Sequence, residues 1–151
     1  MHQIITLTSG VDLSAGEYSN YNIGIPYITG ASNIDDNNNI LINRYTSDKY
    51  INSHKNEILL SCKGTIGKIV INNIGDIHVA RQFMSIKSYI SNDYLMLYLN
   101  TIVSSLNANA KSMIPGIDRK EILTRIINLP PFEEQVRIVK KLYAIRNLIL
   151  S

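Results

Sequence analysis

The stretch EILLSCKGTIGKIVIN, residues 57–72, decides the fold of this chain. Two runs of aliphatic and β-branched residues, 57–62 and 65–72, lie on either side of Lys63 and Gly64. This pattern is typical of two strands joined by a hairpin or a sharp bend. The glycines at 64 and 67 would let the chain turn tightly between the strands. The sequence therefore predicts a sheet in the middle of the chain.

The segments before and after this stretch are also short and rich in strand-forming residues. Residues 4–8 and 23–29 read as strands, although Pro26 makes the second an edge strand or the start of a strand. Gly30, Ser32 and Asn33 mark a loop, and a further strand is expected at residues 82–87. The first part of the chain is therefore predicted to form a β-rich body.

The spacing of apolar residues changes after residue 90. Over residues 91–110 it becomes three and four, which predicts an amphipathic helix with Asn92 or Asp93 as its capping side chain. A short helix at 118–123 and one more short strand at 125–129 are expected next. Pro131 suits the first turn of a last helix, which an apolar stripe predicts over residues 132–150. The expected fold is a single α+β domain, a twisted β-rich body with packed helices and a C-terminal helix.

Composition favours a globular chain that binds polyanions moderately. Its 151 residues are 45% hydrophobic and 18% charged, and the formal net charge is +3. Cys62 is the single cysteine, so an internal disulfide and a cysteine zinc site are excluded, and the cytoplasm is the expected compartment. No apolar run reaches the roughly 18 residues that a membrane span needs, and the first residues do not resemble a signal peptide. We expect no membrane partner.

Motifs for catalysis or cofactor binding fail on spacing. The Gly67-Lys68 pair lacks the glycine five residues earlier and the following Ser or Thr of a phosphate-binding loop. Leu129 interrupts the Asn-Pro-Pro-aromatic order that amino-methyltransferases use. The three histidines have no ligand spacing, and the Asp35-Asp36 pair lies in an Asn-rich segment where turn chemistry explains it. We expect no metal, no cofactor and no catalytic residues.

The remaining candidates are polar and basic side chains on loops beside strands. Asn and Gln can bind adenine, Arg and Lys can bind guanine or phosphate, and Ser or Thr can do either. Taken singly, each is more often a solvated loop residue, and only their common placement on loops favours nucleic-acid binding. The candidate DNA-binding residues are Thr29, Ser32, Asn33, Arg44, Lys49, Lys63, Thr65, Lys68, Arg81, Gln82, Lys111 and Arg119.

The order of segments resembles the target recognition domain of type I restriction-modification specificity subunits. The resemblance covers nearly the whole chain and is strongest in the series Leu-Pro-Pro, Glu-Gln and Arg-Ile-Val over residues 129–139. The Gly-Thr-Ile-Gly-Lys turn at 64–68 is the next most specific element. The other shared segments are residues 24–33, 57–61, 80–83 and the Tyr94-Leu95 pair.

The resemblance implies a recognition module rather than an enzyme. Residues 1–130 would read one half of a split duplex DNA site, and residues 131–151 would begin the spacer helix that pairs with a second such helix. Methylation and cleavage would belong to separate subunits: an adenine methyltransferase that the domain directs, and a restriction subunit bound indirectly. The expected partner-binding residues are Gln135, Val136, Val139, Tyr143 and Ile149.

Several alternatives stay open at the level of sequence. With one recognition domain in place of the usual two, the chain is a half-length subunit that pairs with itself or with a second specificity polypeptide, a fragment, or a relic. It could instead come from a fused restriction-methylation enzyme, or be an interaction protein that no longer reads DNA. The glycines at 64 and 67 could be purely structural, and Gln135 could cap a helix or contact backbone instead of the methyltransferase.

Overall fold

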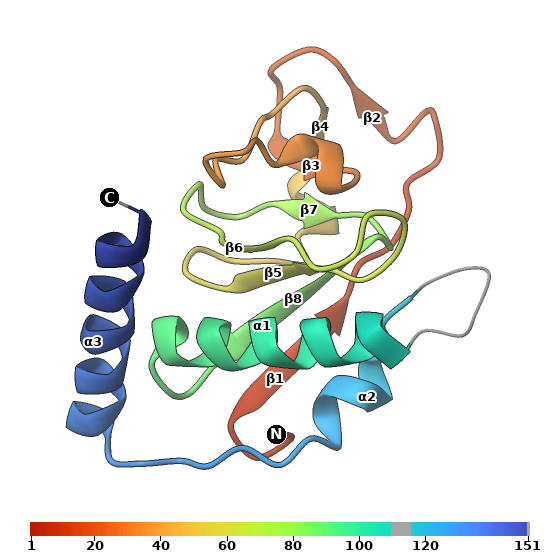
Figure 1. Ribbon diagram of the computed structural model, residues 1–151. Coiled ribbons are helices and arrows are strands. Elements are labelled where there is room, and N and C mark those ends of the chain that lie inside the picture. Colours follow the sequence, from red (N-terminus) through yellow and green to blue (C-terminus); the bar gives the residue numbers. More distant parts are fainter. Residues whose placement is uncertain (110–115, 151) are drawn as a thin grey trace.

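The computed structural model describes residues 1–109 and 116–150. Short strands fill the first part of the chain and helices the second, as the change in period predicts (Figure 1). The strands are β1 Ile5–Ser9, β2 Tyr18–Ser19, β3 Ile25–Ile28, β4 Tyr45–Thr46, β5 Ile58–Ser61, β6 Ile69–Ile71, β7 His78–Val79 and β8 Phe83–Ser88. The helices are η1 Ala31–Asn33 and η2 Asp48–Tyr50, which are 3-10 turns, and α1 Asn92–Asn109, α2 Arg119–Leu123 and α3 Phe132–Leu150.

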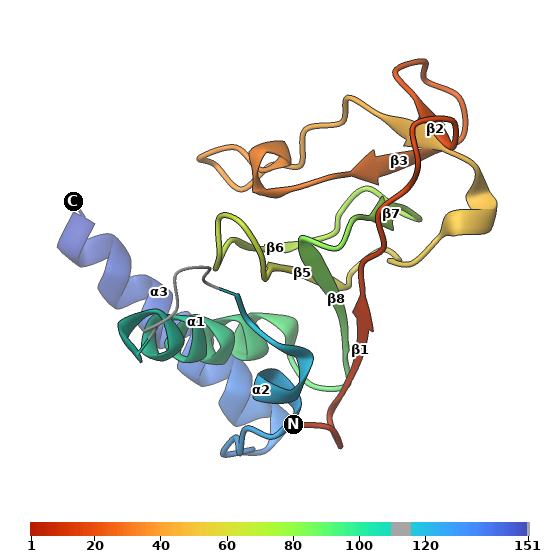
Figure 2. The ribbon, with the colours of Figure 1, turned by 90° about the vertical axis from the view of Figure 1, so that its right-hand side faces the viewer.

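The strands form two four-stranded sheets. The first has the order β1-β8-β5-β6, with every pair antiparallel. The second has the order β2-β4-β3-β7, in which β3 and β7 run parallel. Figure 2 shows the second sheet above the first, with the helices below, so the first sheet is the middle layer. The predicted α+β class is confirmed.

The predicted hairpin of residues 57–72 forms one side of the first sheet, with β5 inside the sheet and β6 at its edge. β5 and β6 pair antiparallel, with Leu60 opposite Ile69. Ile58 and Leu60 pack among the residues under the helices, whereas Leu59 packs on the side of the second sheet. These side chains are fully buried, and each contributes roughly 1.5–3 kcal/mol through burial. A strand buried on both faces explains why its sequence is a continuous apolar run rather than an alternating one.

Helix α1 covers one face of the first sheet. Its buried residues Leu95, Leu99, Ile102 and Val103 follow the predicted spacing of three and four. The capping side chain, however, is that of Ser91, whose hydroxyl oxygen accepts a hydrogen bond from the Tyr94 N–H at 3.4 Å. The predicted helix is therefore present, but it begins one residue later and is capped by the serine before Asn92.

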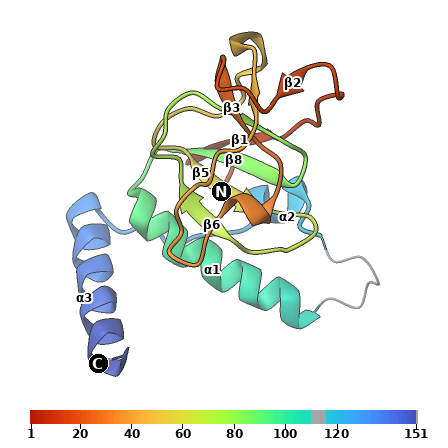
Figure 3. The same ribbon diagram turned by 90° about the horizontal axis from the view of Figure 1, so that it is seen from above.

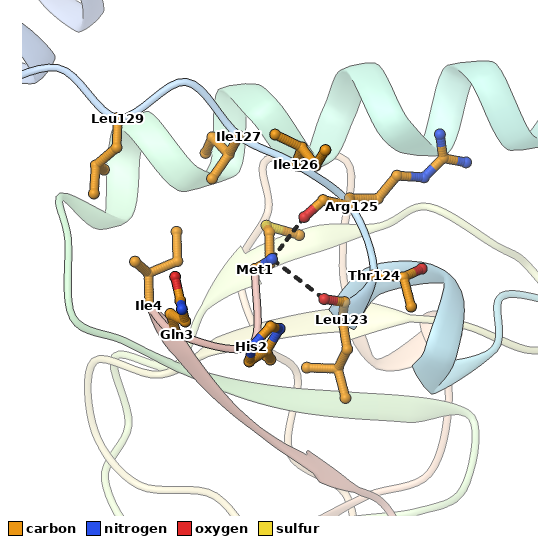
Figure 4. A pocket seen from close by; sticks show the side chains of 10 residues that line it. All are labelled: Met1, His2, Gln3, Ile4, Leu123, Thr124, Arg125, Ile126, Ile127 and Leu129. Carbon is orange, nitrogen blue, oxygen red and sulfur yellow. Dashed lines mark hydrogen bonds between the residues drawn. The ribbon is translucent and has the colours of Figure 1, made fainter.

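The strand predicted at residues 125–129 is absent, and that prediction was wrong. In the described residues this segment pairs with no strand, and carbonyls in it and just before it accept hydrogen bonds from single groups elsewhere in the chain. The Met1 ammonium donates hydrogen bonds to the Leu123 and Arg125 carbonyls at 3.2 and 2.6 Å. These groups line a pocket, and the Arg125 guanidinium points away from it (Figure 4). The Tyr94 and Tyr98 hydroxyls donate to the carbonyls of residues 128 and 126. β-branched content indicated an extended segment but could not supply a strand partner.

Helix α3 stands at one side of the domain, as Figures 1 and 3 show. Its first half lies against the first half of α1, and its C-terminal half extends away from α1. Within residues 1–109 and 116–150, no helix has the length and apolar character needed to cross a membrane.

Candidate nucleic-acid interface

Three loops meet at one edge of the two sheets. They are residues 29–33, which include η1, residues 62–68 between β5 and β6, and residues 80–82 between β7 and β8, and we call them the loop cluster. The first two loops lie at the same edge in Figure 2. Gln82 connects all three, because its side-chain amide lies beside both Gly30 and Gly64.

The turn of residues 62–68 owes its shape to its glycines. Gly64 and Gly67 have φ values of 71° and 91°, which residues other than glycine rarely adopt. A Cβ on Gly67 would lie 2.5 Å from the Val103 Cγ1 of helix α1, so the turn packs closely on that helix. The turn is closed by the Ser61 carbonyl and hydroxyl, which accept hydrogen bonds from the N–H groups of Gly67 and Lys68 at 2.9 and 2.8 Å. The lysines therefore do not set its geometry.

Four predicted DNA-binding side chains of the loop cluster are exposed and available. They carry a hydroxyl, an ammonium or an amide, and none has a hydrogen bond or ion pair through its side chain in the described part of the chain: Ser32, Lys63, Thr65 and Gln82. Lys68 lies beside them, and its ammonium is 4.0 Å from the carboxylate of Asp36. Such a long, exposed ion pair holds the lysine only weakly. The cluster thus offers donors, acceptors and positive charge on one surface.

Asn33 is also in the loop cluster, but its side chain is used inside the protein. It is 2% exposed. Its Oδ1 accepts hydrogen bonds from the Thr29 N–H, the Thr29 hydroxyl and the Gly30 N–H. Its Nδ2 donates to the Leu41 carbonyl and to Asn43 Oδ1. Asn33 and Thr29 therefore tie the cluster to the following loop rather than projecting from it.

The other predicted DNA-binding residues are engaged or distant. Arg119 donates from Nη1 to the Leu7 carbonyl at 2.6 Å. Arg44, just before β4, lies over the ring of Tyr18, and Lys49, in η2, lies over that of Tyr50. Lys111 falls outside the described residues.

Arg81 is exposed within the loop cluster, but it forms an ion pair with Asp12 at 2.7 Å. Asp12 also accepts the Arg81 N–H, so it fixes the arginine's position. Asp12 was not among the predicted site residues, since a lone Asp distant in sequence gives no signal of this contact.

The Asn-rich segment after Asn33 is a closed turn, as predicted from Asp35 and Asp36. Asp35 accepts hydrogen bonds from the N–H groups of residues 37 and 39 at 2.8 Å and from the Asn39 amide at 3.0 Å. These bonds, the one from the Asn39 side chain foremost, lower the pKa of the Asp35 carboxyl. Asp36 points instead toward Lys68, which links this turn to the loop cluster.

The groups usually found in catalytic sites are not assembled in the described residues. No three His, Cys, Asp or Glu side chains gather there as metal ligands would. Burial raises the pKa of the Cys62 thiol, which disfavours the reactive thiolate. His78 lies in the core, with its ring nitrogens against the Tyr50 and Val11 carbonyls. The arrangement supports binding through hydrogen bonds and charge.

Comparison with protein families decides the identity of the domain. Residues 6–150 match the family model described as type I restriction modification DNA specificity domain. The chain belongs to this family. The predicted resemblance to a DNA specificity domain is thereby confirmed.

Solved structures share the fold of the specificity domain at low sequence identity. A chain from a structure of type I restriction-modification complex assembly and conformational transition has a TM-score of 0.83 at 20% identity over 98% of this chain. The HsdS subunit from Thermoanaerobacter tengcongensis has 0.81 at 20% identity over 99%, and the S subunit from M. genitalium has 0.64 at 14% identity over 97%. This chain covers 37% of the length of each. No curated protein matches it.

The predicted partner-binding residues of the specificity domain divide along α3. Gln135 is 3% exposed, and its amide accepts the Ser91 N–H at 3.1 Å and donates to the Pro130 carbonyl at 2.9 Å. Val139 is buried and Val136 half-buried, whereas Tyr143 and Ile149 are exposed. Gln135 thus contacts backbone, one of the two roles predicted for it, and the exposed apolar surface lies in the second half of the helix.

Proposed function

We propose that this chain reads one half of a split duplex DNA site through its loop cluster. The membership in a DNA specificity family supports this function, and one structural observation supports the location. Lys63, Thr65 and Gln82 are exposed side by side, with Lys68 next to them, on loops anchored to a rigid sheet. Loops fixed by a scaffold are where binding residues concentrate. Lysines supply phosphate contacts, and hydroxyls and amides can contact base edges.

The same proposal assigns a role to each part of the chain. Residues 1–130 form the recognition unit and residues 131–151 begin the spacer helix. A separate adenine methyltransferase subunit carries out methylation at the site that the domain selects, and a restriction subunit joins through that complex. The second half-site is read by a second copy or by another specificity polypeptide. Because the ligand is genomic DNA, the proposed compartment is the cytoplasm.

A binding experiment tests the location of the interface. The Lys63→Ala, Lys68→Ala double variant should bind a duplex DNA roughly tenfold more weakly at low salt, because two phosphate contacts are lost. A Lys140→Ala, Lys141→Ala variant removes the same charge from exposed positions on α3 and serves as the control. Circular dichroism should show the same fold in all three proteins. If the double variant and wild type bound DNA with equal affinity, the DNA-binding surface would lie elsewhere on the domain.

A methylation assay tests the division of labour between subunits. The chain alone should transfer no methyl groups to DNA. Addition of the partner methyltransferase should give methylation restricted to one sequence. Methyl transfer by the chain alone would instead mean that the chain is itself an enzyme.

A further inference from the structure

We propose that Gln82 is a specificity-determining residue and that it reads an adenine in the major groove. This inference rests on the proposed function, since it names one base contact of the same interface. It is based on three observations: the backbone of Gln82 is fixed by hydrogen bonds, its side-chain amide lies against two glycines, and the amide is exposed with no partner in the described residues.

The backbone of Gln82 is held from two sides, by Cys62 and by the turn that leads into Phe83. Its carbonyl accepts the Cys62 N–H at 2.8 Å and lies 3.4 Å from the Cys62 thiol. The next residue, Phe83, is fully buried, and its N–H donates to the Ala80 carbonyl at 2.9 Å, which closes a tight turn. The Cα of Gln82 is therefore fixed between the ends of β5 and β8, and its side chain leaves the sheet from a rigid position.

Two glycines form the walls of the space that holds the Gln82 amide. A Cβ added to Gly30 would approach Oε1 closer than 3.0 Å, a distance that real Cβ atoms essentially never show, and one added to Gly64 would lie 3.4 Å from it. The φ of Gly64 is 71°, a backbone conformation that favours glycine whatever the neighbouring side chains are. Gly30 has φ −172°, an extended conformation open to any residue. The Gly30 contact is with the end of the Gln82 side chain, so a side chain added at residue 30 would displace the amide rather than the backbone.

The amide held in this space has no partner in the described part of the chain, although Gln82 is exposed. Two other predicted DNA-binding side chains of the loop cluster, those of Asn33 and Arg81, differ in this respect. The Asn33 amide is used by hydrogen bonds inside the protein, and Arg81 is paired with Asp12. Gln82 therefore presents one acceptor and two donors from a fixed backbone position. This combination matches the N6 amino group and N7 of adenine, which Gln binds with two hydrogen bonds.

Selection from a pool of random-sequence duplexes, with the full chain at low salt, tests this assignment. Wild type should enrich a motif with an A·T pair at one position. At that position Gln82→Ala should lose roughly 5- to 150-fold of its discrimination, with the rest of the motif and the binding of non-specific DNA unchanged. Gln82→Glu, which has no donor, should cease to prefer adenine there.

Gly30→Ala provides an independent test that leaves Gln82 itself in place. The new methyl group should displace the amide and relax the same position of the motif. Gly16→Ala is the matched control, because a Cβ at Gly16 meets nothing within 4 Å. It should select the wild-type motif.

The outcomes separate the two proposals. If wild type selects a motif and Gln82→Ala selects the same one, Gln82 does not read a base, while the DNA-reading function stands. A relaxed position that is a G·C pair overturns the assignment to adenine. If wild type selects no motif although it is folded, the proposed function fails, and the role of Gln82 fails with it.

Discussion

Asn33 and Gln82 carry the same functional group in the same loop cluster but use it in opposite ways. Five hydrogen bonds of the buried Asn33 amide hold the loops together, whereas the Gln82 amide remains available on the surface. From sequence, both were predicted to bind DNA because Asn and Gln have the same chemistry. The difference depends on contacts with residues 41 and 43 in one case and with two glycines in the other, and side-chain type does not reveal such contacts.

Replacement of Asn33 by Ala should therefore lower stability before it affects DNA binding. It leaves the N–H groups of Thr29 and Gly30 and the Leu41 carbonyl without their partner, and a buried unsatisfied group costs about 1–3 kcal/mol. Urea unfolding measures the loss. Ser32→Ala, at the exposed neighbouring position, should change stability by less than about 0.5 kcal/mol. Equal stability of Asn33→Ala and wild type would show that the loops are held by other contacts.

The lowered pKa of Asp35 predicts that the stability of the domain decreases in acid. This pKa is lowered in the folded protein, first by the Asn39 side chain and then by backbone N–H groups. A lowered carboxyl pKa means that the stabilisation is complete above the ordinary value of 3.8 and is lost as the pH falls through the folded value. Asp35→Asn should thus be less stable than wild type at neutral pH, and the difference should vanish in acid. Urea unfolding at several pH values would detect it, with Asp36→Asn as the control.

At the scale of elements, the sequence predicted the long ones better than the short ones. The apolar spacing located α1 and α3 because apolar side chains recur along one face of each helix over several turns, although α3 buries that face only in its first half. The strands β2, β4 and β7 have two residues each, and their pairing depends on neighbours distant in the chain, so no local pattern marks them. The same limit applies to Arg119, whose partner Leu7 lies 112 positions away. Basic side chains could be recognised from sequence, but not which of them the fold already uses.

The exposed apolar side chains in the second half of helix α3 lead us to expect that two copies of the domain associate there. Ile138 and Leu142 face α1 in an apolar groove with Tyr94, Leu97, Tyr98 and Thr101. The same row continues with Ile145 and Ile149, which step by three and four residues and are 44% and 77% exposed. Covering such side chains with a second helix would contribute roughly 1.5–3 kcal/mol each on full burial. We therefore expect wild type to associate as its concentration rises in sedimentation.

Two variants distinguish this surface from the packed half of the helix. Ile145→Glu with Ile149→Glu should abolish association and leave thermal unfolding unchanged at a concentration where wild type is monomeric, because both residues are exposed in the single chain. Val139→Glu should lower the melting temperature instead, since Val139 is buried. Wild type that stays monomeric at every concentration would contradict the proposed pairing.

At the scale of the whole molecule, the net charge of +3 limits how DNA can be bound. Of the basic side chains predicted to bind DNA, several are held by contacts within the protein, so few are available for phosphates. Each phosphate contact releases counterions and adds about 0.9 to the slope of log affinity against log salt concentration. The slope for this chain should therefore be small but measurable.

The slope also shows which lysines contact phosphate. Lys63→Ala and Lys68→Ala should each reduce it by about 0.9, if each ammonium neutralises one phosphate. Lys140→Ala removes the same charge from α3 and should leave the slope unchanged, which separates local contacts from a general effect of net charge. Gln82→Ala should also leave it unchanged, because an uncharged amide releases no counterions while it reads a base. A slope that fell equally for Lys63, Lys68 and Lys140 would mean that the domain attracts DNA by overall charge, without a defined phosphate-binding edge.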